Sequence, residues 1–204
     1  MSVFTEGLLL TIQNLIVQHH TVYPSLPPQG QFFEALVQRA FHLCVAPEVQ
    51  VIASTPNAPS FDLMAAGQKF SIKTETGRGT DANLITITKL CTTEKEPWAA
   101  QVLIQRVLEH LSEYDHMLML RAIWLSGWIH YQLLEIPLDL LRLVHTATVV
   151  PVGRREGRRS LAGDVSDGGQ VLFRVHFDGA DGKCQIRNLR VERCIPLRQW
   201  DQRL

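Results

Sequence analysis

Residues 59–77, PSFDLMAAGQKFSIKTETG, combine the pattern of a short β-hairpin with side chains that could do chemistry. Small residues stand at the expected tip, Asp62 lies before it and Lys73 lies after it. A carboxylate and a lysine held together beside a sheet suit metal-assisted hydrolysis of a phosphodiester bond. The carboxylate can bind a hard cation such as Mg²⁺, and the ammonium can offset charge that develops on the phosphate.

The register of this hairpin decides which side chains meet. A two-residue turn at Ala66–Gly67 would place Asp62 opposite Ser71. A turn one residue later would place Asp62 opposite Lys73. In both registers the alternation of side chains gathers four polar groups on one face, those of Asp62, Ser71, Lys73 and Glu75. A three-residue loop would break this parity, and an ordinary cross-strand ion pair is the simplest alternative explanation.

The hairpin resembles the active-site motif of the PD-(D/E)xK nuclease family, and more closely that of its type II restriction endonucleases. PSFD supplies the motif aspartate, Asp62, and SIK supplies the motif lysine, Lys73. The similarity to the family extends over residues 30–140 and includes the segments GQFFEALVQRAF, ITKL and YQLLEIPLDLL. Family members place a helix with an inward glutamate before the hairpin, and the first segment supplies Glu34 at that place. The resemblance implies Mg²⁺ as the cofactor and double-stranded DNA as the substrate.

One position departs from the family pattern. Ser71 stands two residues before the lysine, where the family usually has Asp or Glu. Another glutamate must then complete the metal site, and we rank Glu34 and Glu75 above Glu94 and Glu96. Glu34 comes from the preceding helix, and Glu75 shares the strand face of Ser71. If no glutamate reaches the metal, the same fold would bind DNA without cutting it.

Three other stretches are candidates for contact with DNA. Residues 153–159, GRREGRR, form a basic loop suited to phosphate groups. Residues 182–190, GKCQIRNLR, alternate long polar side chains as in a two-stranded ribbon that enters the major groove. Residues 76–83 form a loop beside the proposed metal site. The predicted DNA-binding side chains are Arg78, Arg154, Arg155, Arg158, Arg159, Lys183, Gln185 and Arg187. Solvated surface charges and an edge strand are the structural alternatives.

Hydrophobic periodicity predicts the elements that position these residues. We expect helices over residues 5–23, 31–45, 93–118 and 138–145, the third capped by Thr93. We expect strands over residues 48–54, 83–90, 120–137, 170–177 and 184–192, besides the hairpin. This order predicts an α/β (α+β) fold in which helices flank one central mixed β-sheet, restriction-endonuclease-like, with a C-terminal β-ribbon. Residues 1–204 would form a single nuclease domain. Its helices and catalytic sheet would lie in residues 1–150, and its basic loop and ribbon in residues 151–204.

Composition adds little about partners. The chain has 20 Lys and Arg against 20 Asp and Glu, so net charge indicates no class of ligand. Residues 151–204 hold 11 Lys and Arg against 7 Asp and Glu, which favours this part for a polyanion. The apolar run GLLLTIQNLIV is interrupted by polar residues and lacks a basic start, so we expect neither a signal peptide nor a membrane span. A bacterial or archaeal cytoplasmic protein is expected.

The combined expectation is a Mg²⁺-dependent, sequence-specific endonuclease of a restriction-modification system. The apolar surface of residues 97–120 would form the seam of a homodimer, whose two-fold symmetry suits cleavage of both DNA strands. Two alternatives remain at this point. One is a repair nuclease of the same fold that recognises DNA structure, and the other is a catalytically silent DNA-binding protein.

Overall fold

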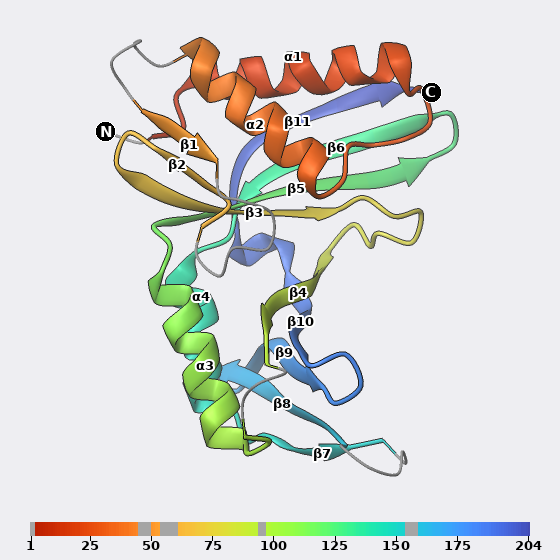
Figure 1. Cartoon of the computed structure of the whole chain (residues 1–204). Helices are drawn as coiled ribbons and strands as arrows, with labels where there is room; N and C mark the ends of the chain where they lie inside the picture. The colour runs from red at the N-terminus through yellow and green to blue at the C-terminus, as the bar shows by residue number, and fades with distance from the viewer. Residues whose placement is uncertain (1–2, 45–49, 54–60, 94–96, 154–158) are drawn as a thin grey trace. The chain divides into compact units, whose positions relative to one another are not determined.

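A computed structural model describes residues 3–44, 50–53, 61–93, 97–153 and 159–204 of the chain (Figure 1). The chain divides into two compact units, each assembled from separate stretches. The first unit comprises Met1–Thr80, Tyr114–Ile136 and Cys194–Leu204. The second comprises Asp81–Glu113 and Pro137–Arg193.

The first unit is built on a mixed sheet that has six strands in the described part of the chain. In spatial order they are β1 (Val51–Ala53), β2 (Leu63–Ala65), β3 (Gln68–Glu75), β5 (His116–Leu125), β6 (Trp128–Glu135) and β11 (Ile195–Arg203). β3 and β5 pair in parallel, and the other neighbours pair in antiparallel fashion. Residues 117–120 of β5 are fully buried, which explains why this strand is continuously apolar rather than alternating.

Two helices, α1 (Glu6–Val22) and α2 (Gln31–Cys44), cover one face of this sheet (Figure 1). The Thr5 hydroxyl accepts a hydrogen bond of 3.3 Å from the Leu8 backbone N–H and so caps α1. Apolar residues at helical spacing, such as Ile12 of α1 and Phe33 of α2, pack in one core with Phe70 of β3. The helices predicted over residues 5–23 and 31–45 are therefore confirmed to within the usual uncertainty of helix ends.

The second unit contains an antiparallel sheet of five strands among the described residues. Their order is β4 (Leu84–Thr92), β10 (Lys183–Arg190), β9 (Gln170–Asp178), β8 (Ser160–Asp167) and β7 (Val150–Val152) (Figure 1). The helical elements of this unit are α3 (Ala100–Ser112), α4 (Leu138–Arg142) and the 3₁₀ turns η1 (Leu143–Thr146) and η2 (Val191–Arg193). No helix in the described ranges is long and apolar enough to cross a membrane.

The mixture of helices with mixed sheets is as predicted, but the prediction of one central sheet is wrong, because the strands divide between two sheets. The C-terminal ribbon is also not a free two-stranded element. β10 pairs with β9 on one side and with β4 on the other, in a register that places Cys184 opposite Cys91. β4 and β10 are separated by about ninety residues in the sequence, so local sequence patterns could not predict that they pair.

The predicted helix over residues 93–118 is too long at both ends. α3 begins at Ala100, after Pro97, and Thr93 instead donates its backbone N–H to the Gly182 oxygen at 2.6 Å. The helix ends at Ser112, and residues 116–118 enter β5, where His116 pairs with Phe70 of β3. Sheet pairing outweighs local periodicity here because residues 117–120 become fully buried in the strand.

Gly163 of β8 gives a test of packing in the second unit. A Cβ atom built on Gly163 would lie 2.6 Å from the Thr148 carbonyl oxygen and 3.2 Å from Val149 Cα, both backbone atoms. We expect Gly163→Ala to lower the free energy of unfolding by about 1–3 kcal/mol, because the backbone must move to make room. Urea unfolding followed by circular dichroism measures this change.

Gly79→Ala is the matched control, since a Cβ atom there meets nothing within 4 Å. Its unfolding free energy should stay within about 0.5 kcal/mol of the wild type. Equal stability of the two variants would contradict the close approach of β8 to residues 148 and 149.

Candidate active site

The hairpin closes through a two-residue turn at Ala66–Gly67. Both turn residues have positive φ, 51° and 75°, as a type I′ turn requires. The flanking pairs are Ala65 with Gln68 and Leu63 with Phe70. This confirms the first of the two predicted registers, and the turn one residue later is wrong. Because the loop has two residues, the predicted parity of the polar face is preserved.

One oxygen of Asp62 is the focus of the polar face. Oδ2 accepts a hydrogen bond of 2.6 Å from the Ile72 backbone N–H and one of 3.4 Å from the Ser71 hydroxyl. The Lys73 Nζ atom also lies 3.4 Å from Oδ2. The side chains of Lys73 and Asp62 are 19% and 29% exposed, so the pair is partly shielded from water. All three contacts go to the same carboxylate oxygen, Oδ2.

Glu34 of α2 brings a second carboxylate to this region. Its pKa is raised, first by partial burial and then by the negative charge of Asp62, while the positive charge of Lys73 acts in the opposite direction. This mutual influence shows that α2 places Glu34 within electrostatic reach of both hairpin residues. Two carboxylates and an ammonium group are thus brought together from three elements of the first unit.

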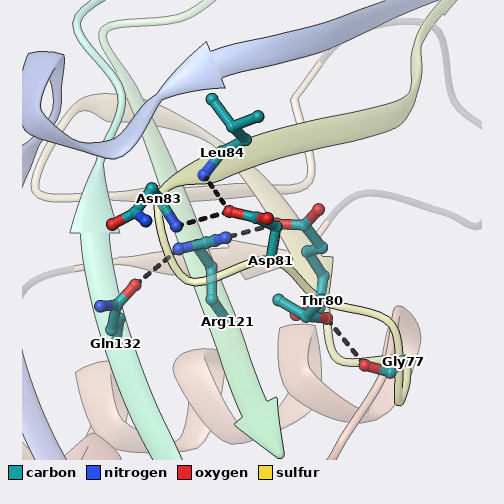
Figure 2. A network of polar contacts seen from close by, with 8 residues as sticks. Gly77, Thr80, Asp81, Asn83, Leu84, Arg121 and Gln132 are labelled. Atoms are coloured by element: carbon teal, nitrogen blue, oxygen red, sulfur yellow. Dashed lines mark hydrogen bonds and ion pairs between the residues drawn. The ribbon is translucent and has the colours of Figure 1, made fainter.

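Glu75 has a different environment. Its Oε2 accepts a hydrogen bond of 2.8 Å from Arg121 Nε, and the Arg121 side chain is fully buried. Arg121 Nη1 in turn donates to Gln132 Oε1 at 2.6 Å, across the β5–β6 pair (Figure 2). A buried guanidinium needs such partners, because an unpaired buried charge is costly. This engagement makes Glu75 a weaker candidate for a metal ligand than Glu34.

Of the remaining predicted metal and motif residues, Ser71 is described by the structure and Glu94 and Glu96 are not. Ser71 is fully buried and donates to Asp62, so its hydroxyl can orient that carboxylate. Glu94 and Glu96 lie outside the described residues, as do the first two residues of PSFD. Within the described ranges no three His, Cys, Asp or Glu side chains form a group that could hold a metal ion. Asp62 and Glu34 are the pair of carboxylates that the described residues offer.

The loop that follows β3 carries Arg78, a predicted DNA contact. Its guanidinium lies 4.7 Å from the centre of the Trp124 ring, and Trp124 Nε1 donates to the Thr76 carbonyl at 3.1 Å. The Thr80 hydroxyl donates to the Gly77 carbonyl at 2.8 Å and closes the loop (Figure 2). Arg78 is therefore an exposed cation held just beyond the end of β3.

The other predicted DNA contacts belong to the second unit. Arg154, Arg155 and Arg158 lie outside the described residues. Arg159 is exposed, and its carbonyl accepts a hydrogen bond of 2.6 Å from Trp98 Nε1.

On β10, the side chains of Lys183, Gln185 and Arg187 lie on one face, as their alternation predicted. Lys183 pairs with Asp181 at 2.6 Å. Gln185 is 8% exposed and accepts hydrogen bonds from Arg187.

Two groups of polar residues were missed by sequence reasoning. Arg121 and Gln132 interrupt the apolar runs of β5 and β6. A polar residue within a run that is otherwise apolar could have indicated a buried polar pair in the sequence. Arg174 and His176 alternate along β9 in the segment FRVHF, in phase with the polar residues of β10. The strand β9 was predicted, but the residues that lie opposite Arg174 and His176 depend on its pairing with β10.

Comparison with known proteins identifies relatives over most of the chain. The SmaI family, described as a type II site-specific deoxyribonuclease, matches residues 2–202. The type II restriction enzyme SmaI of Serratia marcescens is 31% identical over 157 residues, which cover 75% of this chain and 64% of that enzyme. The match thus spans less than two thirds of the relative's length. No solved structure matches the chain.

The buried network around Arg121 predicts a large effect on stability. We expect Arg121→Met to lower the free energy of unfolding by about 3–5 kcal/mol, because it leaves the Glu75 carboxylate without its buried partner. Chemical denaturation measures the change. Arg142→Met is the control, because Arg142 and its partner Asp139 are 40% and 94% exposed and such a pair contributes less than about 1 kcal/mol. Similar losses for both variants would show that the Glu75–Arg121 pair is not specially stabilising.

Proposed function

Because the chain belongs to the SmaI family of type II site-specific deoxyribonucleases, we propose that it is a restriction endonuclease that hydrolyses phosphodiester bonds at a specific sequence in double-stranded DNA. The family match confirms the resemblance to type II restriction endonucleases, and membership of the PD-(D/E)xK superfamily is part of the proposal. The observation that carries the proposed chemistry is the convergence of Asp62, Lys73 and Glu34 in a member of this family.

Asp62 and Glu34 are the proposed ligands of a divalent cation, with Mg²⁺ as the expected ion. The donor set fits, because carboxylate oxygens are the ligands that Mg²⁺ prefers. Burial is the main cause of the raised pKa of Glu34 and the charge of Asp62 adds to it, so a cation bound by both carboxylates would relieve their repulsion. When bound, the cation would polarise the scissile phosphate and activate a water molecule. Glu75 is the second choice for a ligand because Arg121 already engages it.

Lys73 and Ser71 have complementary proposed roles. In phosphodiester hydrolysis water adds to phosphorus, the bond to the leaving oxygen breaks, and negative charge grows on the phosphate oxygens. The Lys73 ammonium offsets that charge and helps to orient the water. Ser71 and the Ile72 N–H hold Asp62 Oδ2, which fixes the orientation of the carboxylate. A serine at this position therefore has a use even though it supplies no charge.

Exposed cations at the end of β3 and in the second unit are the proposed contacts with DNA. Arg78 would meet the backbone of the cleaved strand, and the basic loop with Arg159 would meet other phosphates. The side chains of Lys183 and Arg187 would lie toward the duplex from β10, and the buried Gln185 would support Arg187 from the same face. We also propose a single nuclease domain over residues 1–204, a homodimer and a cytoplasmic location.

One observation favours a second candidate function. Ser71 replaces the acid of the family motif, so a catalytically silent DNA-binding protein of the same fold is the alternative. A structure-specific repair nuclease is a further outcome to distinguish. Incubation with plasmid DNA and Mg²⁺ separates the three. Discrete, reproducible fragments support restriction, smears or branch-specific cuts support repair, and duplex binding without cutting supports the silent protein.

Asp62→Ala and Lys73→Ala should each reduce the rate of plasmid cleavage at least about a hundredfold, because each removes a charge that acts on the reacting phosphate. Affinity for the duplex, measured by fluorescence anisotropy, should change less than about threefold, since most of it comes from other phosphate contacts.

Asp139→Ala and Lys89→Ala are matched controls at exposed positions and should cut at the wild-type rate. Wild-type cutting by either active-site variant would show that the site is wrongly assigned.

Glu34→Gln separates stability from metal binding. The pKa of Glu34 is raised above its ordinary value of 4.5, so its contribution to stability is present at low pH and is lost as pH rises through the raised pKa. At pH 7 the neutral glutamine should therefore leave the metal-free protein equally or more stable. The same variant should lose plasmid cutting and the rise in melting temperature that Mg²⁺ produces in the wild type.

Glu109→Gln, on α3, is the control and should keep both responses to Mg²⁺. If Glu34→Gln retains the Mg²⁺-dependent melting shift, Glu34 does not bind the metal.

A further inference from the structure

The five-stranded sheet of the second unit has two chemically different faces. Directly paired side chains of antiparallel strands point to the same side. The pairs Cys184–Phe177, Ile186–Val175 and Val165–Phe173 lie on one face, and all of these residues are buried. The opposite face carries the pairs Arg187–Arg174, Gln185–His176 and Lys183–Asp178, together with Asp164. One face therefore packs the core, and the other presents polar groups from β9 and β10.

Two arginines lie directly opposite each other on this polar face. Arg174 of β9 pairs in register with Arg187 of β10, an arrangement that is unfavourable for like charges. Asp164 lies 3.1 Å from Arg174 and offsets one of the two charges. Arg187 donates hydrogen bonds to the neutral amide of Gln185. A local excess of positive charge remains, which suits an anionic or acceptor-rich ligand.

Gln185 holds the Arg187 guanidinium in one orientation. Its Oε1 accepts hydrogen bonds of 2.9 Å from Nε and 2.6 Å from Nη2. Gln185 is itself 8% exposed, so it has little surface for a ligand. The two bonds use Nε and Nη2 of the planar guanidinium, and among the described residues Nη1 keeps its donors for another acceptor. Gln185 thus acts on a ligand through Arg187 rather than by direct contact.

His176 stands beside this arginine pair. Its pKa is lowered, first by burial and then by Arg187, while Asp178 opposes the shift and Arg174 adds to it. The ring is therefore neutral at pH 7, with one donor and one acceptor nitrogen. Nδ1 is buried and makes no hydrogen bond to the described residues. Because Nδ1 is buried, a ligand would meet the ring through its other nitrogen, Nε2.

The two carboxylates on this face have partners of their own. Asp164 is paired with Arg174. Burial acts to raise the pKa of Asp178, but backbone hydrogen bonds from Ala180 and Asp181 and the charge of Lys183 outweigh it, so the pKa is lowered. Asp178 is thereby tied into the turn between β9 and β10. The positive region that remains centres on the two arginines, and its charge is complementary to DNA.

We propose that Arg174, His176 and Arg187 form a base-reading row that contributes to sequence specificity, with Gln185 as the residue that positions Arg187. The inference rests on the proposed function and adds two residues of β9 to it. Arginine is the side chain that most often binds guanine, through two hydrogen bonds to O6 and N7. A fixed guanidinium beside a neutral imidazole offers directional donors and acceptors, which distinguish base edges in a way that mobile surface cations do not.

The test compares the sequences that each variant cuts. A pool of DNA duplexes with a randomised interior is digested with full-length protein and Mg²⁺, and the cut ends are sequenced. Arg187→Lys keeps the charge but loses the planar fork, so preference at one base-pair position of the wild-type motif should fall roughly tenfold to a hundredfold. His176→Ala and Arg174→Lys should relax the same or a neighbouring position. Affinity for a duplex that lacks the motif should change less than about threefold.

Gln185→Leu tests the positioning role. It should relax the same position as Arg187→Lys, and the two changes together should add nothing beyond Arg187→Lys alone. Gln185→Asn retains an amide acceptor and should recover part of the preference. Arg190→Lys is the matched control on the same strand, where Arg190 pairs with Glu192, and should leave the motif unchanged.

The outcomes distinguish failure of the base-reading row from failure of the restriction function. If the wild type yields a motif and the row variants yield the same motif with the same preference, the base-reading row is overturned while the restriction function stands. A uniform loss of cutting and of affinity for unrelated duplexes would also overturn it, because that result indicates a phosphate contact. If the wild type itself yields no motif, the proposed restriction function fails and the row fails with it.

Discussion

The geometry of the candidate active site depends on a turn of two residues. Ala66 and Gly67 adopt positive φ angles, and the resulting register sets which side chains of β2 and β3 share a face. Side chains alternate along a strand, so one extra loop residue would separate Asp62 from Lys73. The same register brings the Ile72 N–H to the Asp62 carboxylate, which is thereby oriented by backbone as well as by side chains.

Both units contain like charges that a ligand of opposite sign would relieve. In the first unit Asp62 and Lys73 act in opposite directions on the pKa of Glu34, and burial adds to the effect of the aspartate. In the second unit Arg174 faces Arg187 across a strand pair. Clusters of interacting charged groups of this kind are common at functional sites. We propose that the first binds a divalent cation and that the second contacts DNA, the two ligands that the proposed enzyme needs.

Local sequence patterns predicted much of the fold and part of the site. Helical periodicity identified α1, and alternation identified the hairpin, β4 and β10. Prediction failed where distant segments compete with local preference. Residues 116–118 continue a helical pattern, yet they form part of β5 and pair with β3. β11 was not predicted at all, because its residues are mostly exposed and it forms as a strand through its pairing with β6.

The sequence by itself determined the chemistry available at the hairpin, because the residue types and their parity follow from a short stretch of chain. It could not decide among the glutamates. Glu34 is brought to Asp62 by the packing of α2 on the sheet, and Glu75 is drawn to Arg121, 46 residues later, by the parallel pairing of β3 with β5. Burial and charge pairing depend on such long-range contacts, and these exist only once the sheets have assembled.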